Sequence, residues 1–299
     1  MNEYSYQEHH MGTTVSLSFV CRDHMTANTM ANYAFTIIKD YEEQFSRFLP
    51  QSELSRLNQR RQATVSDIFL IVLTRSLELH QLTQGNFNPL LQVQTLGYNR
   101  NYAELASATA RIIPSNYDTD VSQIQIDKST NLVVLSEQQQ LDFGGLIKGY
   151  LAAEIANTIM KINNSCTGCI INIGGDLATR GYDELHQPFI FYLYNPITGI
   201  ELPITVKDQS LATSGTYARK WRTSHGLQNH IVDSHTRQNP TTGLVAVSIV
   251  AQDGALTEAL TKLFLTRGIE AAITIASPQN YHYQYFTVSN AGEIMSNLI

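Results

Sequence analysis

The stretch Leu141-Asp-Phe-Gly-Gly-Leu-Ile-Lys-Gly-Tyr-Leu-Ala-Ala-Glu154 carries the strongest local signal in this chain. Two glycines, Gly144 and Gly145, precede an apolar-periodic run that predicts a helix through Ile159, with Lys148 in its first turn. Glycine lets the backbone approach a ligand closely, and a helix start offers unpaired N–H groups and a positive dipole end. The pattern therefore favours a ligand that carries phosphate.

A second stretch, residues 170–176 (Ile-Ile-Asn-Ile-Gly-Gly-Asp), is typical of a buried strand that ends at Gly174, Gly175 and Asp176. A strand that stops on two glycines and an acid again suggests backbone packed closely against a ligand. Each signal is weak by itself, because glycine pairs more often mark turns or helix caps. The spacing is also neither that of a Rossmann motif nor that of a P-loop.

The overall composition excludes several classes of protein. The chain has 299 residues, of which 43% are hydrophobic, enough for a large core in one or two lobes. Its net charge of −6 and the lack of a long basic run argue against nucleic acid as the main partner. No apolar stretch approaches the length of a membrane span. The polar first residues indicate no signal peptide, so the chain as given is expected in the cytoplasm, or exported if a leader has been removed.

Three cysteines, Cys21, Cys166 and Cys169, cannot all pair with one another. Cys166-Thr-Gly-Cys169 has the spacing of a redox or zinc motif, but no second cysteine pair or histidine cluster completes a zinc site. Reduced structural thiols are therefore expected.

Hydrophobic periodicity predicts alternating strands and helices along the whole chain. No internal repeat or linker interrupts them, so a single unit over residues 11–299 is expected to follow a flexible tail at residues 1–10. The expected strands are 12–20, 189–194, 201–206 and 245–251, the expected hairpin is 123–137, and the expected helices are 25–45, 65–82 and 256–266.

The segments 141–149 and 171–181 resemble the two central motifs of the ApbE family, the FAD:protein FMN transferases. Five further segments resemble family motifs in the same order along the chain: Met11–Ser16, Phe45–Asn58, Asn86–Asn88, Leu211–Tyr217 and Asn229–Asp233. The resemblance implies an α+β fold with mixed, largely antiparallel sheets. It also implies binding of FAD and transfer of its FMN half to a Thr or Ser of an acceptor protein, with release of AMP.

The resemblance also assigns roles to individual residues. His230 and Asp233 are the candidates for proton handling and orientation, since an imidazole with a pKa near 6.5 can accept a hydroxyl proton. Without the resemblance, His230 can equally be a buried histidine whose hydrogen bonds are satisfied, and Phe48 can equally be a core residue. The residues implied to border the flavin are Met11, Phe48, Asn86, Phe87 and Asn88, and those implied to bracket the nucleotide are Asp142, Gly145, Lys148, Gly174, Gly175, Asp176, Thr213 and Ser214.

The chain departs from the family at the expected metal site. The family places an Asp and, four residues later, a Thr on one helix face, where they hold Mg²⁺ with a carbonyl of the central loop. Here these positions are Glu258 and Lys262, which leaves Glu258 and the Gly145 carbonyl as ligands, because a protonated lysine cannot ligate. Either the Lys262 ammonium takes the place of the metal, or the helix is shifted and Asp253, Thr257 or Thr261 serves. The first interpretation is favoured because the apolar face of this helix stays in register with the family motif.

Two further departures keep alternative functions open. Asn88 stands where the family usually has Asp, and residues 234–238 (Ser-His-Thr-Arg-Gln) replace the usual Pro-x-Thr-Gly. One alternative is a hydrolase that splits FAD into FMN and AMP. The other is a flavin-binding protein that has lost metal-dependent catalysis, so Mg²⁺ is an expected cofactor only if the altered site still holds it.

Overall fold

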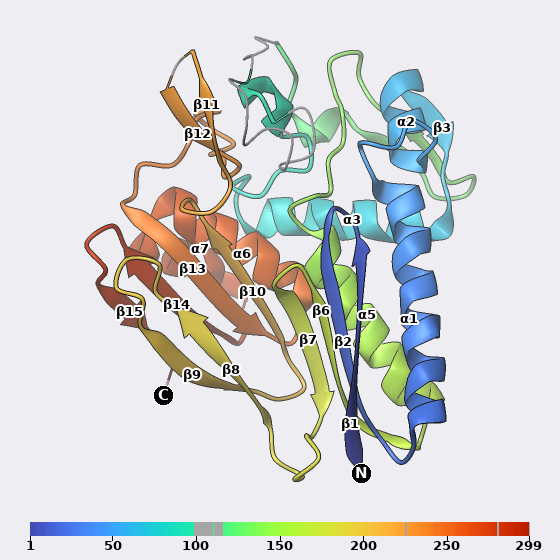
Figure 1. Ribbon diagram of the computed structural model, residues 1–299. Coiled ribbons are helices and arrows are strands. Elements are labelled where there is room, and N and C mark those ends of the chain that lie inside the picture. The colour runs from blue at the N-terminus through green and yellow to red at the C-terminus, as the bar shows by residue number, and fades with distance from the viewer. Residues whose placement is uncertain (99–109, 111–115, 225, 280, 299) are drawn as a thin grey trace.

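An eight-stranded sheet forms the centre of the computed structural model, which describes residues 1–98, 110, 116–224, 226–279 and 281–298 (Figure 1). Neighbouring strands in this sheet run antiparallel. In spatial order the strands are β1 (Asn2–His10), β2 (Thr13–Cys21), β6 (Cys166–Ile173), β7 (Asp176–Gly181), β10 (Ser210–Gly215), β13 (Leu244–Ala251), β14 (Tyr283–Ser289) and β15 (Ile294–Ser296).

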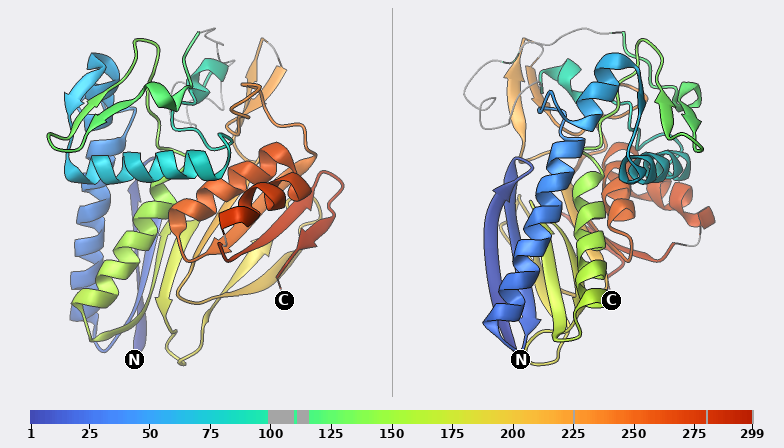
Figure 2. Two further views of the ribbon diagram at one scale, coloured as in Figure 1. Left: turned by 180° about the vertical axis from the view of Figure 1, so that it is seen from behind. Right: turned by 90° about the vertical axis from the view of Figure 1, so that its right-hand side faces the viewer.

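Helices cover one face of this sheet, as the two views in Figure 2 show. They are α1 (His24–Phe45), α5 (Ile147–Ile162), α6 (Gly254–Arg267) and α7 (Ile269–Ala276), while α2 (Glu53–Arg60) and α3 (Asp67–Leu82) lie at one end. A hairpin of β8 (Phe189–Tyr194) and β9 (Glu201–Val206) packs on the other face. Within the described residues, no helix is long and apolar enough to cross a membrane.

Strand β13 shows how the sheet serves two cores. Val247 and Ile249 belong to the large core under the helices, whereas Ala246 and Val250 belong to the smaller core under the β8–β9 hairpin. This follows from the two-residue period of a strand, which sends alternate side chains to opposite faces. A strand buried on both faces is almost entirely apolar, which is why its sequence alone predicts it.

Two smaller sheets and three 3₁₀ turns complete the described structure. They are the three-stranded sheet β3 (Gln62–Thr64), β5 (Leu132–Val134) and β4 (Gln125–Asp127), the hairpin β11 (Lys220–Thr223) and β12 (Gly226–Asn229), and the 3₁₀ turns η1 (Val93–Leu96), η2 (Val121–Gln123) and η3 (Ser277–Gln279). The expected helices and strands and the expected hairpin are confirmed, with ends that differ by a few residues. The three cysteines are free and buried, and burial raises the pKa of Cys21 to about 12, as expected of structural thiols.

One expectation is wrong: residues 1–10 are not a tail, because Asn2–His10 form strand β1. This strand pairs residue by residue with β2 through the two-residue turn Met11–Gly12, in which both residues have positive φ. Such turns match the twist of a hairpin. The side chains of β1 are mostly exposed and polar, so its sequence lacks the apolar alternation that reveals a strand.

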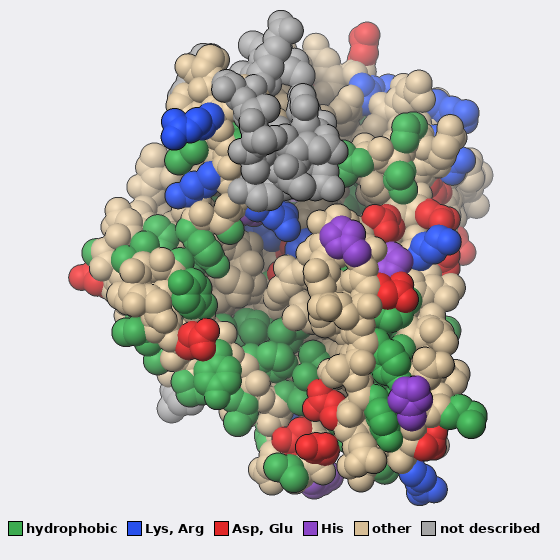
Figure 3. All heavy atoms as spheres, viewed as in Figure 1, with side chains coloured by type: hydrophobic (Ala, Val, Ile, Leu, Met, Phe, Trp, Pro, Cys, Tyr) green, Lys and Arg blue, Asp and Glu red, His purple; other side chains and the backbone are tan. Residues whose placement is uncertain are grey.

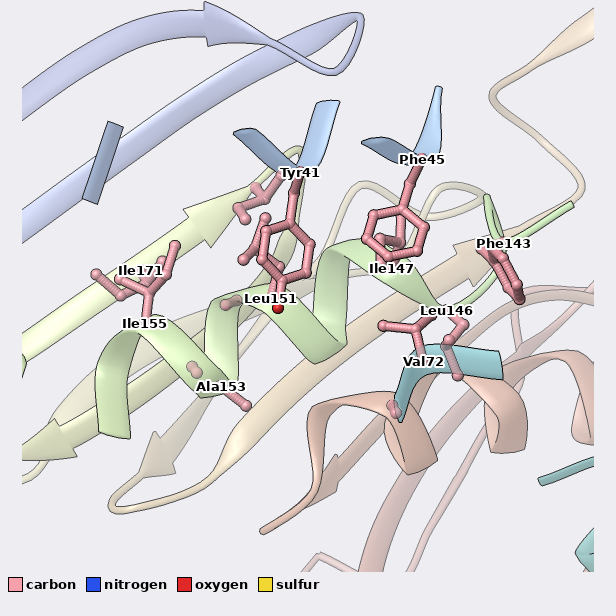
Figure 4. Packing of buried hydrophobic residues seen from close by; sticks show 14 of the residues in the cluster. Tyr41, Phe45, Val72, Phe143, Leu146, Ile147, Leu151, Ala153, Ile155 and Ile171 are labelled. Carbon is pink, nitrogen blue, oxygen red and sulfur yellow. The ribbon is translucent and has the colours of Figure 1, made fainter. Parts of the chain in front are cut away.

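The start of α5 is anchored in an aromatic part of the core (Figure 4). Phe45 of α1 stacks on Phe69 of α3 with 5.4 Å between ring centroids, and Phe143 meets both rings edge-on at 5.8 and 5.5 Å. Next to Phe143, the Asn58 side chain bonds both backbone groups of Leu141, at 2.7 and 2.8 Å. These contacts hold the loop of residues 142–145 in place before the helix begins.

Candidate active site

Helix α5 begins without a side-chain cap of its own, unlike its neighbours. Asp23, Ser52, Ser66 and Asp253 each cap the helix that follows them, but the side chain of Leu146, the N-cap residue of α5, cannot accept a hydrogen bond. The cap comes from α6 instead, since Glu258 Oε1 accepts the Gly149 N–H at 2.8 Å. A carboxylate at this end of a helix also interacts favourably with the helix dipole.

Two glycines, one in α5 and one in α6, allow these two helices to approach each other closely. A Cβ on Gly149 would overlap the carbonyl oxygen of Gly254, and a Cβ on Gly254 would overlap the carbonyl oxygen of Gly149. No other residue fits at either position without moving the backbone. The contact brings Glu258, one turn into α6, within reach of the first turn of α5.

Two lysine–carboxylate pairs lie beside this helix start. Lys262 Nζ donates to Glu258 Oε2 at 2.9 Å, four residues along α6, and Lys148 pairs with Asp176 at the start of β7. Glu258 is only 1% exposed and Asp176 only 4%. Buried charges are tolerated when they are paired and hydrogen-bonded, and each carboxylate here is.

The close charges shift the pKa values of Glu258, Asp176 and Lys148. Burial raises the pKa of Glu258, but Lys262, Lys148 and the Gly149 N–H outweigh it, so the net shift is downward. Burial and then the Glu258 charge raise the pKa of Asp176. For Lys148, the attraction of Asp176 and Glu258 outweighs burial and raises the pKa. Lys148 is therefore a cation at neutral pH.

Two hairpin tips form the adjoining wall. The tip Met11–Gly12 lies next to the tip Gly174–Gly175, because β2 and β6 are neighbours in the sheet. Gly174 has no room for a side chain, since its Cβ would lie 2.5 Å from Thr13 Oγ1. The expected strand end is thus a tight β6–β7 turn in which Ile173 pairs with Asp176, and the chain continues directly into β7.

These elements surround a cavity of about 1120 Å³. In Figure 3, Lys and Arg side chains lie in the hollow near the centre of this face. All predicted site residues but one line the cavity: Met11, Phe48, Asn86, Phe87, Asn88, Asp142, Gly145, Lys148, Gly174, Gly175, Asp176, Thr213, Ser214, His230, Glu258 and Lys262. The structure therefore brings together residues that are spread over most of the chain.

The exception is Asp233. Its Oδ1 accepts the backbone N–H groups of His235 and Thr236, at 2.8 and 3.2 Å, and so caps a turn away from the cavity lining. Residues 230–233 do not form a strand, because β12 ends at Asn229 and a bend follows. The Asn239 side chain holds this bend through the carbonyl oxygens of Asn229 and Ile231, at 2.8 and 2.7 Å. Short polar side chains that bond nearby backbone favour turns over strands.

His230 lies in the cavity among cations. Burial, followed by the charges of Arg219, Lys262 and Lys148, lowers its pKa to about 3. Its Nδ1 is buried and has no hydrogen-bond partner within the described part of the chain. A neutral imidazole with a free nitrogen is therefore held at the cavity wall at neutral pH.

Sequence analysis missed two arginines that line the cavity. Arg47 pairs with Asp142 and lies over the rings of Phe48 and Tyr98, at 4.7 and 5.1 Å from their centroids. Arg219 makes no ion pair with a carboxylate of the described residues. Arg47 lies within the motif Phe45–Asn58, where the aromatic residue alone was singled out, and Arg219 has no local signal.

The change to Asn88 has a structural reason. The Asn88 side chain donates to the Thr119 carbonyl at 3.0 Å and accepts the Leu90 N–H at 2.9 Å. An ionised aspartate could keep only the second bond, since it has no N–H to donate. The neighbouring Asn86 has a buried Oδ1 that lacks a partner within the described residues, and it lines the cavity.

The two hydroxyl residues of β10 connect the cavity wall to its support. Ser214 and Thr261 share a hydrogen bond of 2.8 Å, as do Thr213 and Ser248. Thr213 and Ser214 therefore line the cavity as positioned hydroxyl groups rather than as free ones.

The described residues do not fit a magnesium site. They contain no cluster of three or more His, Cys, Asp and Glu that could hold a metal ion. Both oxygens of Glu258 are engaged, and beside the Gly145 backbone lies the Lys262 side chain, whose Cε would be 3.5 Å from a Cβ there. An ammonium group offers no lone pair to a cation.

The alternative metal ligands are engaged elsewhere. Asp253 caps α6 and pairs with Arg75 at 2.5 Å, Thr257 donates to the Gly254 carbonyl, and Thr261 donates to the Glu258 carbonyl. None of the three lines the cavity. The interpretation with a shifted helix is therefore wrong, and Lys262 does pair with Glu258.

The fold and the site together define a class of protein. An α+β domain in which two lysines and a helix start meet at one large cavity has the features that suit a phosphate-bearing ligand. The chain belongs to the ApbE family, whose model matches residues 11–286.

Relatives named FAD:protein FMN transferase match most of the chain at low identity. A FAD:protein FMN transferase of Klebsiella pneumoniae is 23% identical, over 98% of this chain and 92% of that protein. A second protein of that name, from Haemophilus influenzae, is 21% identical over 90% of this chain and 82% of its own.

Solved structures of the family have the same fold. The ApbE protein of Thermotoga maritima superimposes with a TM-score of 0.85 and 22% identity, covering 98% of this chain and 96% of that one. The apo form of the flavinyl transferase ApbE of Pseudomonas stutzeri gives a TM-score of 0.83 at 16% identity, over 99% and 94% of the two chains. The α+β fold with largely antiparallel sheets is thereby confirmed.

Proposed function

We propose that this chain is a FAD:protein FMN transferase, which moves FMN from FAD onto a Thr or Ser hydroxyl of an acceptor protein and releases AMP. The observation that carries the proposal is the cavity of about 1120 Å³, which holds the start of α5, Lys148 and Lys262 together with exposed aromatic side chains. Its volume slightly exceeds the usual range of small-molecule sites, about 300 to 1,000 Å³, which suits a ligand as large as a dinucleotide. The relatives that carry this name support the same assignment.

The cavity offers different surroundings to the two kinds of group in FAD. Phe48 is 50% exposed and offers an aromatic face to a flat ring, while the Arg47 guanidinium lies over Phe48 and over Tyr98, which itself stacks on Trp221. The lysines and the start of α5 suit the diphosphate. The flavin then lies toward the aromatic residues, and the phosphates toward α5.

The reaction is an in-line attack of the acceptor hydroxyl on the FMN-side phosphorus. A bond forms between the hydroxyl oxygen and that phosphorus, and the bond to the bridging oxygen breaks, so AMP leaves with the electron pair. Lys148 and Lys262 offset the negative charge that moves onto the leaving phosphate, and the cavity walls hold the groups in line. No step runs through a metal ion, because both oxygens of Glu258 are already hydrogen-bonded, one of them by the Lys262 ammonium.

His230 receives the hydroxyl proton in this scheme. Its imidazole is neutral, and Nδ1 is free within the described residues. In the free protein the charges of Arg219, Lys262 and Lys148 hold its pKa low. A bound diphosphate offsets these charges, so it raises the pKa of His230 and strengthens it as a base when the substrate is present.

The test is to incubate the protein with FAD and a peptide that carries a flavinylation motif, both in EDTA and in MgCl₂, then measure the peptide's mass and the free nucleotides. The expected result is a covalent FMN adduct on a Thr or Ser, with one AMP released per adduct. Free FMN and AMP without an adduct would show an FAD pyrophosphatase instead. Unchanged FAD that stays bound would show a flavin-binding protein without this activity, and either result would overturn the proposal.

A further inference from the structure

We propose that the Lys262 ammonium takes the place of a divalent cation in this protein, so that FAD binds without Mg²⁺. The inference rests on the proposed function, because it concerns how the same cavity holds the diphosphate of FAD.

Glu258 has no oxygen left for a metal ion. Oε1 accepts the Gly149 N–H at 2.8 Å and Oε2 accepts from Lys262 Nζ at 2.9 Å, in a position that is 1% exposed. A metal would have to displace either the cap of α5 or the lysine. Displacing either one leaves a buried polar group without its partner, which is costly.

The path of the Lys262 side chain explains why its ammonium lies at the site. Lys262 follows Glu258 by four residues, so both side chains project from one face of α6. Its Cε passes 3.5 Å from the position of a Cβ on Gly145, in the loop that precedes α5. The ammonium is thereby held between the Glu258 carboxylate and the loop, beside the cavity into which the diphosphate would enter.

The charges nearby disfavour an added cation. Glu258 and Asp176 are each paired with a lysine, so this group of four side chains has no net charge. Arg219 adds a positive charge that no described carboxylate pairs with. A Mg²⁺ ion needs about six oxygen ligands in octahedral geometry, and here it would meet two ammonium groups at close range.

A lysine also differs from a metal ion in what it can do for the ligand. It supplies one charge and three N–H donors on a flexible side chain, with no fixed coordination geometry. Binding of the diphosphate is therefore expected to depend on Lys262 and to be insensitive to chelators. Charge-assisted hydrogen bonds to phosphate give such a lysine a large share of the affinity.

The first experiment uses the unaltered protein. FAD affinity is measured by calorimetry in EDTA and in MgCl₂, and the electron paramagnetic resonance signal of free Mn²⁺ is followed as protein and FAD are added. The expected result is a change in Kd of less than about twofold and no stoichiometric loss of the free Mn²⁺ signal, since no ligand set is present. FAD binding that is lost in EDTA, with one Mn²⁺ bound per protein, would overturn the inference.

The second experiment removes the ammonium. Lys262→Met keeps the length of the side chain and is expected to weaken FAD binding in EDTA by about ten- to one-hundred-fold, the usual range for a hydrogen bond to a charged group. Lys161→Met, on the exposed last turn of α5, is the matched control and is expected to leave the affinity unchanged. Equal FAD affinity in the Lys262→Met variant and this control would refute the role of Lys262.

The third experiment builds an oxygen ligand set. The double variant Glu258→Asp/Lys262→Thr is expected to bind FAD at least about ten times more tightly in Mg²⁺ than in EDTA, because a carboxylate and a hydroxyl now face the diphosphate. No response to Mg²⁺ in a folded double variant would contradict the inference. Should this variant not fold, the first experiment still decides the question.

These outcomes separate the inference from the proposed function. If FAD does not bind in either EDTA or Mg²⁺, both proposals fail together. If FAD binds only with Mg²⁺, the inference fails and the transferase assignment stands. If FAD binds without Mg²⁺ but no FMN adduct forms, the inference stands and the transferase assignment fails.

Discussion

Glu258 and Lys262 are predicted to act as one energetic unit that joins α6 to α5. The perturbation is a double-mutant cycle with Glu258→Gln, Lys262→Met and the combined variant. Glutamine keeps an acceptor for the Gly149 N–H but removes the charge that faces Lys262. Methionine removes the ammonium and leaves the buried carboxylate with its backbone partner only.

The structure predicts that the two single substitutions lower the free energy of unfolding by different amounts. Lys262→Met leaves a carboxylate that is 1% exposed without its cation, and breaking a buried ion pair costs about 3 to 5 kcal/mol. Glu258→Gln leaves an ammonium on a side chain that is 19% exposed and that can partly rehydrate, so a smaller cost of about 1 to 3 kcal/mol is expected. The combined variant has no unpaired charge, and its cost is expected to be smaller than the sum by about 1 to 3 kcal/mol.

The measurement is urea unfolding followed by far-ultraviolet circular dichroism, with the four proteins compared at one pH and salt concentration. Equal slopes of the free energy of unfolding against urea would show that the same transition is compared. A coupling energy below about 0.5 kcal/mol is the value expected of independent sites. That result would refute the reasoning, because it would mean that the two side chains do not sense each other.

Three other outcomes follow from the site. FAD is expected to bind more tightly than FMN, because the lysines at α5 suit a diphosphate; equal affinities by calorimetry would contradict this. His230→Gln is expected to reduce the loss of stability on acidification: His230 stays neutral in the folded protein down to a pKa of about 3, whereas the unfolded chain binds a proton below about 6.5. At pH 4.5 this effect amounts to about 2 to 3 kcal/mol in the free energy of unfolding. It is measured by urea unfolding at a series of pH values, and curves of stability against pH that run parallel for the two proteins would rule it out. Asn88→Asp is expected to lower the free energy of unfolding by about 1 to 3 kcal/mol at neutral pH, because the bond to the Thr119 carbonyl is lost; an unchanged urea midpoint would show that this bond contributes nothing.

Local patterns in the sequence predicted most of the elements, for reasons that lie within a few residues. The helix after Gly145 follows from its apolar period, and the buried strand expected from residue 170 follows from its apolar run, although β6 begins earlier, at Cys166. The turn at Gly174–Gly175 was expected as a strand end because glycine tolerates positive φ. The resemblance to family motifs then indicated which of these elements lie at one site, and all but one of the indicated residues line the cavity.

The tertiary structure decided where the charged side chains find their partners. Glu258 caps α5 from 109 residues away, and Arg47 pairs with Asp142 across 95 residues. No local pattern specifies such pairs, because they depend on how closely two elements pack, as at Gly149 and Gly254. The same holds for the polar strand β1, which forms because β2 offers it a partner along its whole length. The sequence therefore determined most helices and strands and the loop before α5. Packing between distant segments determined which charged side chains pair with one another at the site.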